Sequence, residues 1–400
     1  MLNIFSKISY KFSTNAIFIL YSIVGDLLLS QEIFGKFSII LAIEILIFNI
    51  SDYFNTRYLL GKFSSKPEKY YLKEILSFKI FWGLLSIIVF SSIFLFYQVP
   101  WFWIAILIAI NYIQILSSTI ATYNFANNRN IQILISNIIG MLIATLTIIL
   151  YYYFYGKVDI FILLISLLSY RAVEIVVLYN SINLIEVNKT YKYTIQDIKE
   201  AFSFYIQLVI SMASAKLFML FLPSFISYSK ISIIATYEYI LAIPLFLISV
   251  LTMSTYSQLH HTKLQISFQP KLYKSIIIKY YKKAILVSLF FMVIQLIYIF
   301  YIKSNLIQYL PYLLIQDITI VFSAMQGFLL FFWKLDKLYI VITIIMFITK
   351  NTVLLYLISI YGIIGYFWIA VILEISILLY IQYSIYQKHR ITLKKGSIDE

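Results

Sequence analysis

Ten ionisable side chains lie inside long apolar stretches of this sequence, where charged groups are rare. A charge at the centre of a bilayer costs several kcal/mol, so such a group is expected to face a partner or a water-filled cavity. A carboxylate in that setting can hold a proton, and a lysine or arginine can hold an anionic group. The ten side chains are Asp26, Glu44, Asp52, Arg171, Glu174, Lys216, Glu238, Asp317, Lys350 and Glu374.

Two of these carboxylates end a phrase that the chain contains twice. "KFSIILAIE" ends at Glu44 and "KISIIATYE" ends at Glu238, each running from a lysine through a serine and an Ile-Ile pair. Upstream, "FS" precedes Asp26 and Lys216 by the same distance. Six apolar segments separate the copies, so both would run in the same direction across a membrane. This indicates a parallel duplication, although chance matching in a chain rich in Ile, Ser and Phe stays open.

The ionisable groups divide into two sets by the chemistry they could perform. The candidates for holding an anionic group are Lys216, Lys350 and Arg171; the candidates for coupling or gating are Glu44, Asp52, Glu238, Asp26 and Asp317. If the halves are equivalent, Glu44 and Glu238 would project into one cleft, near the outer ends of their helices. The alternative is static ion pairing between helices, which stays open above all for Arg171 with Glu174, three residues apart.

Composition sets the class of protein to which these groups belong. The chain has 400 residues, of which 62% are hydrophobic and 12% charged, with a mean hydropathy of +0.91. Apolar stretches of about 20 residues, each long enough to cross about 30 Å of hydrocarbon, recur throughout. We therefore expect an all-α polytopic membrane protein rather than a soluble domain.

Several other classes are excluded or disfavoured. The chain has no cysteine, which rules out disulfides and thiolate metal sites, and we expect the three histidines to lie on the surface. No phosphate-binding glycine loop occurs, and no loop exceeds roughly 25 residues. The net charge of +14 sits in loops between apolar spans, as membrane orientation requires, which argues against nucleic acid. We expect no enzymatic activity, no cofactor and no metal.

The apolar pattern predicts about twelve transmembrane helices in two six-helix bundles. The predicted bundles cover residues 1–190 and 191–386, followed by a basic cytoplasmic tail at 387–400. The predicted spans are 13–29, 37–58, 78–98, 101–122, 132–155, 159–180, 203–223, 232–256, 284–302, 307–332, 338–359 and 363–386.

The basic residues predict the orientation of these spans. With the N-terminus in the cytoplasm, 24 of the 31 lysines and arginines fall in cytoplasmic segments, among them Lys79. Only Lys36, Lys157, Lys230 and Lys303 fall outside. By the positive-inside rule both termini are cytoplasmic, which requires an even number of spans.

At this point the chain resembles the Wzx-type polysaccharide transporters of the multidrug/oligosaccharidyl-lipid/polysaccharide exporter superfamily. "SQEIFGKFSIILAIEILIFNISDYF" is similar to their first outer turn and second helix, and "YSKISIIATYEYILAIPLFLISVLTMSTYSQL" to their eighth. "FANNRNIQILISNIIG" and "SIYGIIGYFWIAVILEISILLYIQYSI" resemble the start of their fifth helix and their last helix. The chain departs from the pattern at Tyr53, where a glycine is frequent, and at Tyr256-Ser257, where a proline is common.

The resemblance implies a flippase of a bacterial inner membrane. Such a protein moves undecaprenyl-diphosphate-linked oligosaccharide, an O-antigen or capsule repeat unit, from the inner to the outer leaflet by alternating access between two lobes. It would work in lipopolysaccharide or capsule biosynthesis beside glycosyltransferases and a polysaccharide polymerase. Whether an ion is coupled to this movement stays open. The alternatives are a multidrug exporter of the same superfamily and, less favoured, a membrane polysaccharide polymerase, whose large outer loop this chain lacks.

Overall fold

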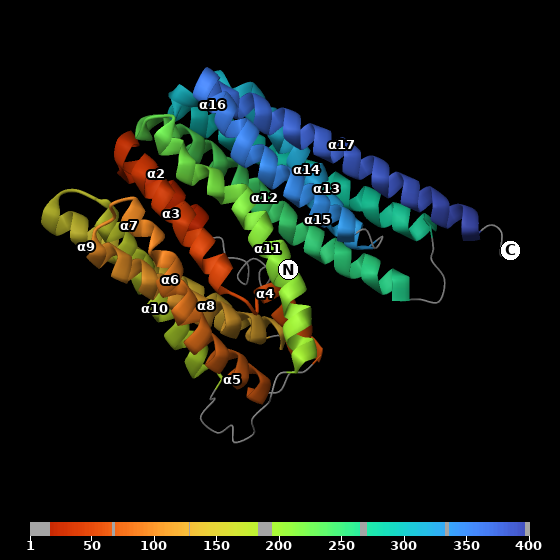
Figure 1. Cartoon of the computed structure of the whole chain (residues 1–400), viewed down its shortest axis with the longest axis horizontal. Helices are drawn as coiled ribbons and strands as arrows, with labels where there is room; N and C mark the ends of the chain where they lie inside the picture. The colour runs from red at the N-terminus through yellow and green to blue at the C-terminus, as the bar shows by residue number, and fades with distance from the viewer. Residues whose placement is uncertain are drawn as a thin grey trace. The chain divides into compact units, whose positions relative to one another are not determined.

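The computed structural model describes residues 17–65, 69–127, 129–182, 194–264, 270–332 and 336–396, and all regular secondary structure in this part of the chain is helical (Figure 1). The first copy of the upstream "FS", at Phe12-Ser13, lies outside the described residues. By its contacts the chain divides into two compact units, Met1–Ser232 and Ile233–Glu400. The boundary lies after residue 190 because α11 (Ile195–Phe221) packs along α3 (Gln31–Ser51) in the first unit. The six-plus-six division drawn from the sequence repeat stays a prediction.

The first unit is built from long apolar helices joined by shorter helical segments. In chain order these are α2 (Ile17–Leu28), α3 (Gln31–Ser51), α4 (Thr56–Ser65), α5 (Lys69–Phe78), the π-helical segment η2 (Lys79–Gly83), α6 (Leu84–Ser91), α7 (Ile93–Phe96), α8 (Trp101–Ala126), α9 (Asn130–Tyr155), α10 (Ile160–Asn180), α11 (Ile195–Phe221), the 3-10 segment η4 (Leu222–Ser224) and the first turn of α12.

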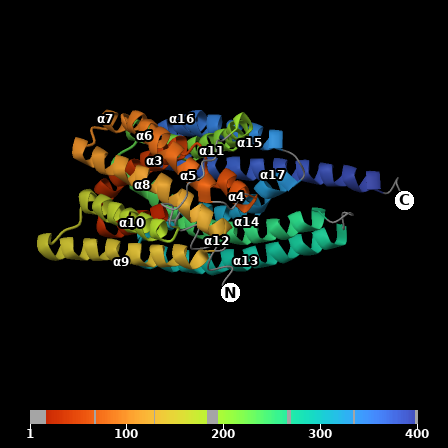
Figure 2. The same ribbon diagram turned by 90° about the horizontal axis from the view of Figure 1, so that it is seen from below.

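The second unit contains most of α12 and all later helices. They are α12 (Tyr228–Leu264), α13 (Pro270–Tyr301), the 3-10 segment η5 (Ser304–Tyr309), α14 (Leu310–Phe332), α15 (Asp336–Thr349), the π-helical segment η6 (Lys350–Leu354), α16 (Leu355–Tyr361) and α17 (Ile363–Gly396). Within this unit α12 and α13 run side by side, and α14 packs on α13 and α17 (Figure 2).

Within the described residues, each of the twelve predicted spans overlaps at least one helix or run of helical segments. Nine of the helices in the described residues are long and apolar enough to cross a membrane. The predicted fold class, an all-α polytopic membrane protein, is therefore confirmed.

The clearest departures lie after the second predicted span. That span was expected at 37–58, but α3 ends at Ser51, and Asp52 leaves the helical conformation with φ −90° and ψ 67°. The next predicted span was expected from residue 78, but its helix begins at Lys69. Hydropathy placed both ends poorly, because aromatic residues continue past the end of α3 and because α5 begins with polar residues that read as a loop.

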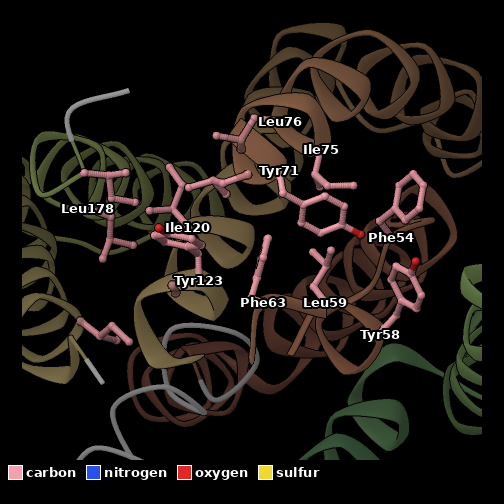
Figure 3. Packing of buried hydrophobic residues seen from close by; sticks show 14 of the residues in the cluster. Phe54, Tyr58, Leu59, Phe63, Tyr71, Ile75, Leu76, Ile120, Tyr123 and Leu178 are labelled. Atoms are coloured by element: carbon pink, nitrogen blue, oxygen red, sulfur yellow. The ribbon is translucent and has the colours of Figure 1, made fainter. Parts of the chain in front are cut away.

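Aromatic side chains fill the core around α4. Phe54, Tyr58 and Phe63 come from the segment after α3, and they meet Tyr71 from α5 and Tyr123 from α8 (Figure 3). The rings of Phe63 and Tyr123 meet edge to face with centroids 5.3 Å apart, a favourable arrangement for aromatic pairs. Packing of this cluster, rather than intrinsic helix propensity, explains why the short and weakly apolar α4 is ordered.

Hydrogen bonds hold α11 to α3 and its neighbours at both ends. At the end where α3 stops, the Tyr53 hydroxyl donates to the carbonyl of Ile198 at 2.9 Å, and the Tyr205 hydroxyl donates to the carbonyl of Ile50 at 2.7 Å. At the opposite end, the Tyr97 hydroxyl donates to the carbonyl of Leu220. These contacts make α11 an integral helix of the first unit.

The start of α12 also touches α3. A Cβ atom on Gly35 would lie 2.0 Å from the carbonyl oxygen of Tyr228, so only a glycine permits this approach. The Lys36 ammonium lies 5.2 Å from the centroid of the Tyr228 ring, within cation–π range. The first turn of α12 is thereby anchored to the first turn of α3.

Candidate functional site

A cluster of fully buried polar side chains lies inside the first unit, on α3, α8 and α10. Glu44 of α3 is 0% exposed, with Asn111 of α8 beside it and Arg171 of α10 within electrostatic range. Neither carboxylate oxygen of Glu44 and neither amide atom of Asn111 has a hydrogen-bond partner among the described residues. Polar groups buried in this way are costly to leave unsatisfied, so this cluster is a candidate site for a proton or another small polar occupant.

The arginine of this cluster is held within its own helix. Arg171 Nη1 donates to Glu174 Oε2 at 2.7 Å, and both side chains are 0% exposed. The Ser117 hydroxyl of α8 donates to the same carboxylate oxygen at 2.9 Å. This pair is nearly neutral as a unit. Glu44 is therefore the one carboxylate of the cluster without a salt bridge in the described part of the chain.

A second buried ion pair lies where α3 ends. The Lys79 ammonium donates to Asp52 Oδ1 at 2.5 Å and to Thr119 Oγ1 at 2.7 Å, and it is 1% exposed. The sequence had placed Lys79 among the basic residues of cytoplasmic segments; the structure shows that it is a buried helical residue paired with Asp52 rather than an exposed loop residue. Lys79 opens the π-helical segment η2, and such single-turn bulges occur often at functional sites.

A third network joins α4 to the start of α11. The Nζ atom of Lys62 lies 2.9 Å from Asp197 Oδ1 and 2.9 Å from Glu200 Oε2. The hydrogen bond from Lys62 holds the pKa of Glu200 below its ordinary value. Partial burial opposes the charge on Lys62, but the hydrogen bonds to Glu200 and Asp197 outweigh burial and raise its pKa.

The second unit holds two further carboxylates that the sequence singled out. Asp317 of α14 is 1% exposed, and its Oδ1 accepts a hydrogen bond from Gln295 of α13 at 3.3 Å. Glu238 of α12 is half-buried and accepts one from the Tyr366 hydroxyl of α17 at 3.3 Å. Each interacts with a polar but uncharged side chain.

The repeated phrase therefore ends in two different environments. Glu44 is fully buried among α3, α8 and α10, whereas Glu238 is half-buried and bonded to a tyrosine. Glu44 also lies 13 residues after Gln31, about 20 Å along a helix of about 31 Å. That position is nearer the end of α3 than its beginning, where the sequence had placed it. A common cleft lined by both carboxylates stays a prediction.

The remaining candidates have distinct settings. Lys216 on α11 and Lys350 at the start of η6 are both partly exposed, although each lies within an apolar stretch. Asp26 on α2 is 5% exposed. The side chain of Glu374 lies outside the described residues.

Three groups in these clusters were missed in the sequence. Lys79 was overlooked because a lysine at the predicted edge of a span resembles a loop residue. Asn111 and Gln295 are amides inside apolar helices. An amide is costly in hydrocarbon unless it is hydrogen-bonded, so these residue types could have indicated buried polar contacts. No group of three or more His, Cys, Asp or Glu side chains suited to a metal ion occurs within the described ranges.

Comparison with known proteins identifies the fold. No protein-family model matches the chain, and no curated protein matches it. Among solved structures, it is similar to an outward-facing multidrug resistance MATE family transporter of the MOP superfamily, with a TM-score of 0.65, 16% identity and coverage of 97% of this chain and 95% of that chain. It is also similar to a MATE transporter in complex with MaD5, with a TM-score of 0.64, 12% identity and coverage of 97% and 96%.

A third similar structure is a MOP superfamily transporter from Pyrococcus furiosus. Its TM-score is 0.61 at 13% identity, with coverage of 97% of this chain and 96% of that chain. The description of that protein states that the polarity of its binding pocket is reversed and suggests a different function. At these identities the likeness shows the fold. The chain has the fold of MOP superfamily transporters over nearly its whole length.

Proposed function

We propose that this chain is a MOP superfamily transporter that flips an undecaprenyl-diphosphate-linked oligosaccharide, an O-antigen or capsule repeat unit, from the inner to the outer leaflet by alternating access. The shared fold supports a transporter, since the likeness covers 97% of the chain. The residues within the helices support the choice of substrate, because fold alone does not identify a cargo.

The observation that carries the choice of substrate is the presence of two lysines within apolar helices. Lys216 lies in the first unit and Lys350 in the second, and both are partly exposed. An ammonium group on a long flexible side chain is a common ligand for phosphate oxygens. Arg171 is less suited to this role, since it is fully buried and bonded to Glu174.

The buried acids supply a means of coupling transport to proton movement. Glu44 has no salt bridge in the described part of the chain, and a buried charge without a counter-ion is unfavourable. Proton uptake and release by Glu44 and Glu238 would change the charge inside each unit during the cycle. Asp26, Asp52 and Asp317 are further candidates, although Asp52 already pairs with Lys79.

The proposed orientation follows from the distribution of basic residues. Both termini would be cytoplasmic in a bacterial inner membrane, and the proposed partners are glycosyltransferases and a polysaccharide polymerase of the same pathway. Epitope tags after Lys66, after Lys271 and at the C-terminus should be accessible only from the cytoplasm. A tag at Lys157 should be accessible only from outside. An externally accessible C-terminus would contradict the twelve-span orientation.

A multidrug exporter is the second candidate. Two of the similar structures are described as multidrug resistance transporters, which favours this reading. Cationic drugs, however, suit an acidic site better than one containing Lys216 and Lys350. The description of the Pyrococcus furiosus protein associates a different pocket polarity with a different function on this same fold.

Flipping in proteoliposomes tests the proposal directly. We expect the purified protein to expose a fluorescent undecaprenyl-diphosphate oligosaccharide on the opposite leaflet and not to transport ethidium. Lys216→Ala and Lys350→Ala should each raise the substrate concentration that gives half-maximal flipping about tenfold. This is the effect of losing one charge-assisted hydrogen bond. Lys230→Ala, which removes an exposed lysine at the start of α12, is the control. Ethidium transport without flipping would favour the exporter.

A further inference from the structure

The helix α12 contains a proline in its interior, and this leaves one backbone carbonyl without its helical donor. Pro244 has no N–H group, so it cannot bond to the carbonyl oxygen of Ile240, four residues earlier. Ile240 is 3% exposed, and water is therefore not available at its surface to replace the missing donor. A buried carbonyl in this position requires another hydrogen-bond donor.

Gln295 of α13 supplies that donor. Its Nε2 atom donates to the Ile240 carbonyl at 3.2 Å, and the Gln295 side chain is 4% exposed. The same Nε2 atom donates to Asp317 Oδ1 of α14 at 3.3 Å. A side-chain amide carries two hydrogens, so both bonds form at the same time. One amide group therefore joins the interrupted turn of α12 to a carboxylate two helices further along the chain.

The orientation of this amide is determined by its two partners. Both partners are oxygen acceptors, so an amide turned the other way would place its own oxygen against a carbonyl and a carboxylate. Gln295 Oε1 and Asp317 Oδ2 have no hydrogen-bond partner among the described residues. The amide of Gln295 is thus the only side chain in the described part of the chain that donates to this carboxylate.

Other ionisable groups nearby are engaged elsewhere. The Tyr298 hydroxyl of α13 bonds to the Tyr239 hydroxyl of α12 at 2.7 Å, and Tyr366 of α17 bonds to Glu238. None of these four groups forms a hydrogen bond or ion pair with Asp317 within the described ranges. The charge on Asp317 therefore acts on α12 chiefly through Gln295.

We propose that Gln295 is a positioning residue that links the charge on Asp317 to the interrupted turn of α12 at Pro244. The charged carboxylate is a strong acceptor and fixes the amide, and the fixed amide in turn holds the open Ile240 carbonyl. Loss of the charge weakens the first bond, releases the amide and loosens the interrupted turn. This inference goes beyond the proposed function, because it concerns how a change at one helix reaches another whatever the cargo.

Hydrogen–deuterium exchange of the full-length protein in lipid nanodiscs tests the link without any substrate. Gln295→Leu should raise the exchange rate of backbone amides in residues 240–248 about three- to tenfold, the equivalent of one lost hydrogen bond. Asp317→Asn, which keeps the shape and removes the charge, should raise it in the same region by a smaller factor. The exchange measurement does not depend on transport. A negative flipping assay would therefore not affect its interpretation.

A Pro244→Ala background and a matched control variant separate a positioning role of Gln295 from general destabilisation. Pro244→Ala restores the backbone N–H that bonds to Ile240, so in this background Gln295→Leu and Asp317→Asn should no longer change exchange at 240–248. Ser288→Ala is the matched control: it removes a 3.3 Å bond from the Ser288 hydroxyl to the backbone carbonyl of Asp317, but leaves Gln295 in place. It should leave exchange at 240–248 unchanged.

Three results would overturn the proposal. The first is unchanged exchange at 240–248 in Gln295→Leu. The second is an equal rise in the Pro244→Ala background, which would show that the effect does not pass through the Ile240 carbonyl. The third is an equal rise in Ser288→Ala, which would show that any loss of a buried hydrogen bond near Asp317 loosens α12.

Discussion

The ammonium nitrogen of Lys79 lies 2.5 Å from Oδ1 of Asp52, and neither side chain is more than 2% exposed. Removing one member of such a pair leaves the other charge buried alone. We therefore expect Lys79→Met to destabilise the protein by about 3–5 kcal/mol. The double variant Asp52→Leu/Lys79→Met should recover much of that loss, since no charge then remains unpaired. Thermal unfolding in detergent would measure both, with Lys199→Met at an exposed position as the control. Equal destabilisation by the single and double variants would contradict the pairing argument.

The ion pairs of Lys62 should make the junction of α4 and α11 sensitive to pH at both extremes. The pKa of Glu200 is lowered by its bond to Lys62, so its stabilising contribution exists above its unfolded pKa of about 4.3 and is lost as the pH falls through the lower folded value. The pKa of Lys62 is raised, so its contribution exists below about 10.4 and is lost as the pH rises through the folded value. The stabilising effect should therefore be greatest between about pH 5 and 10.

The measurement for this junction is the difference in Tm between the wild type and Lys62→Ala across the pH range. We expect that difference to be largest near neutral pH, to shrink at both extremes and to fall with added salt, because the pair is partly exposed. Lys199→Ala removes a charge from the same turn of α11 as Glu200 and serves as the control. A difference independent of pH would mean that Lys62 acts through packing alone.

Transport should depend on Glu44 and Glu238 in different degrees. Glu44→Gln and Glu238→Gln remove an ionisable group while nearly preserving shape, so both variants should insert and fold. We expect both to impair flipping and to change its dependence on external pH. The effect should be larger for Glu44, because it is fully buried whereas Glu238 bonds to Tyr366. The test compares flipping in proteoliposomes at two external pH values. An unchanged wild-type pH profile in both variants would leave these acids a purely structural role.

Gly35 should not tolerate a larger residue. An added methyl group would lie 2.0 Å from the backbone oxygen of Tyr228, which cannot move aside as a side chain could. Gly35→Ala should separate the starts of α3 and α12 and lower stability by more than about 2 kcal/mol. Gly83→Ala is the matched control, because its nearest atoms would lie 3.7 Å away on the Ile115 side chain. Similar Tm values for the two variants would contradict the close approach at Tyr228.

Hydropathy predicted the helical fold because crossing hydrocarbon demands long apolar segments with internally satisfied backbones. It could not predict that α3 ends at Ser51, since the aromatic Tyr53 and Phe54 follow, or that a helix begins at Lys69, since charged residues there read as a loop. The spacing of Arg171 and Glu174 indicated a bridge as one alternative, because residues three apart on a helix are neighbours.

The surroundings of the predicted site residues were less accessible to sequence reasoning. The position of Glu44 inside an apolar stretch indicated that it faces a partner or a cavity, but not which helices surround it. Asn111 and Arg171 come from distant parts of the chain, and only tertiary packing places them near Glu44. The equal endings of the repeated phrase also gave no indication that Glu44 and Glu238 differ in burial, since identical residue types can occupy different positions in a packed unit.

The attachment of α11 to α3 has a consequence for the order in which the protein is assembled. Chains are inserted from the N-terminus, so the six preceding spans enter the bilayer before α11 is made. Until then the hydroxyl of Tyr53 lacks its acceptor on Ile198, and Lys62 lacks Asp197 and Glu200. A nascent chain stopped at residue 190 would expose these groups, whereas one stopped at Ser232 would contain all their partners. The smallest fragment able to mature on its own, and to escape quality-control proteolysis, should therefore contain the first seven predicted spans with the first turn of α12.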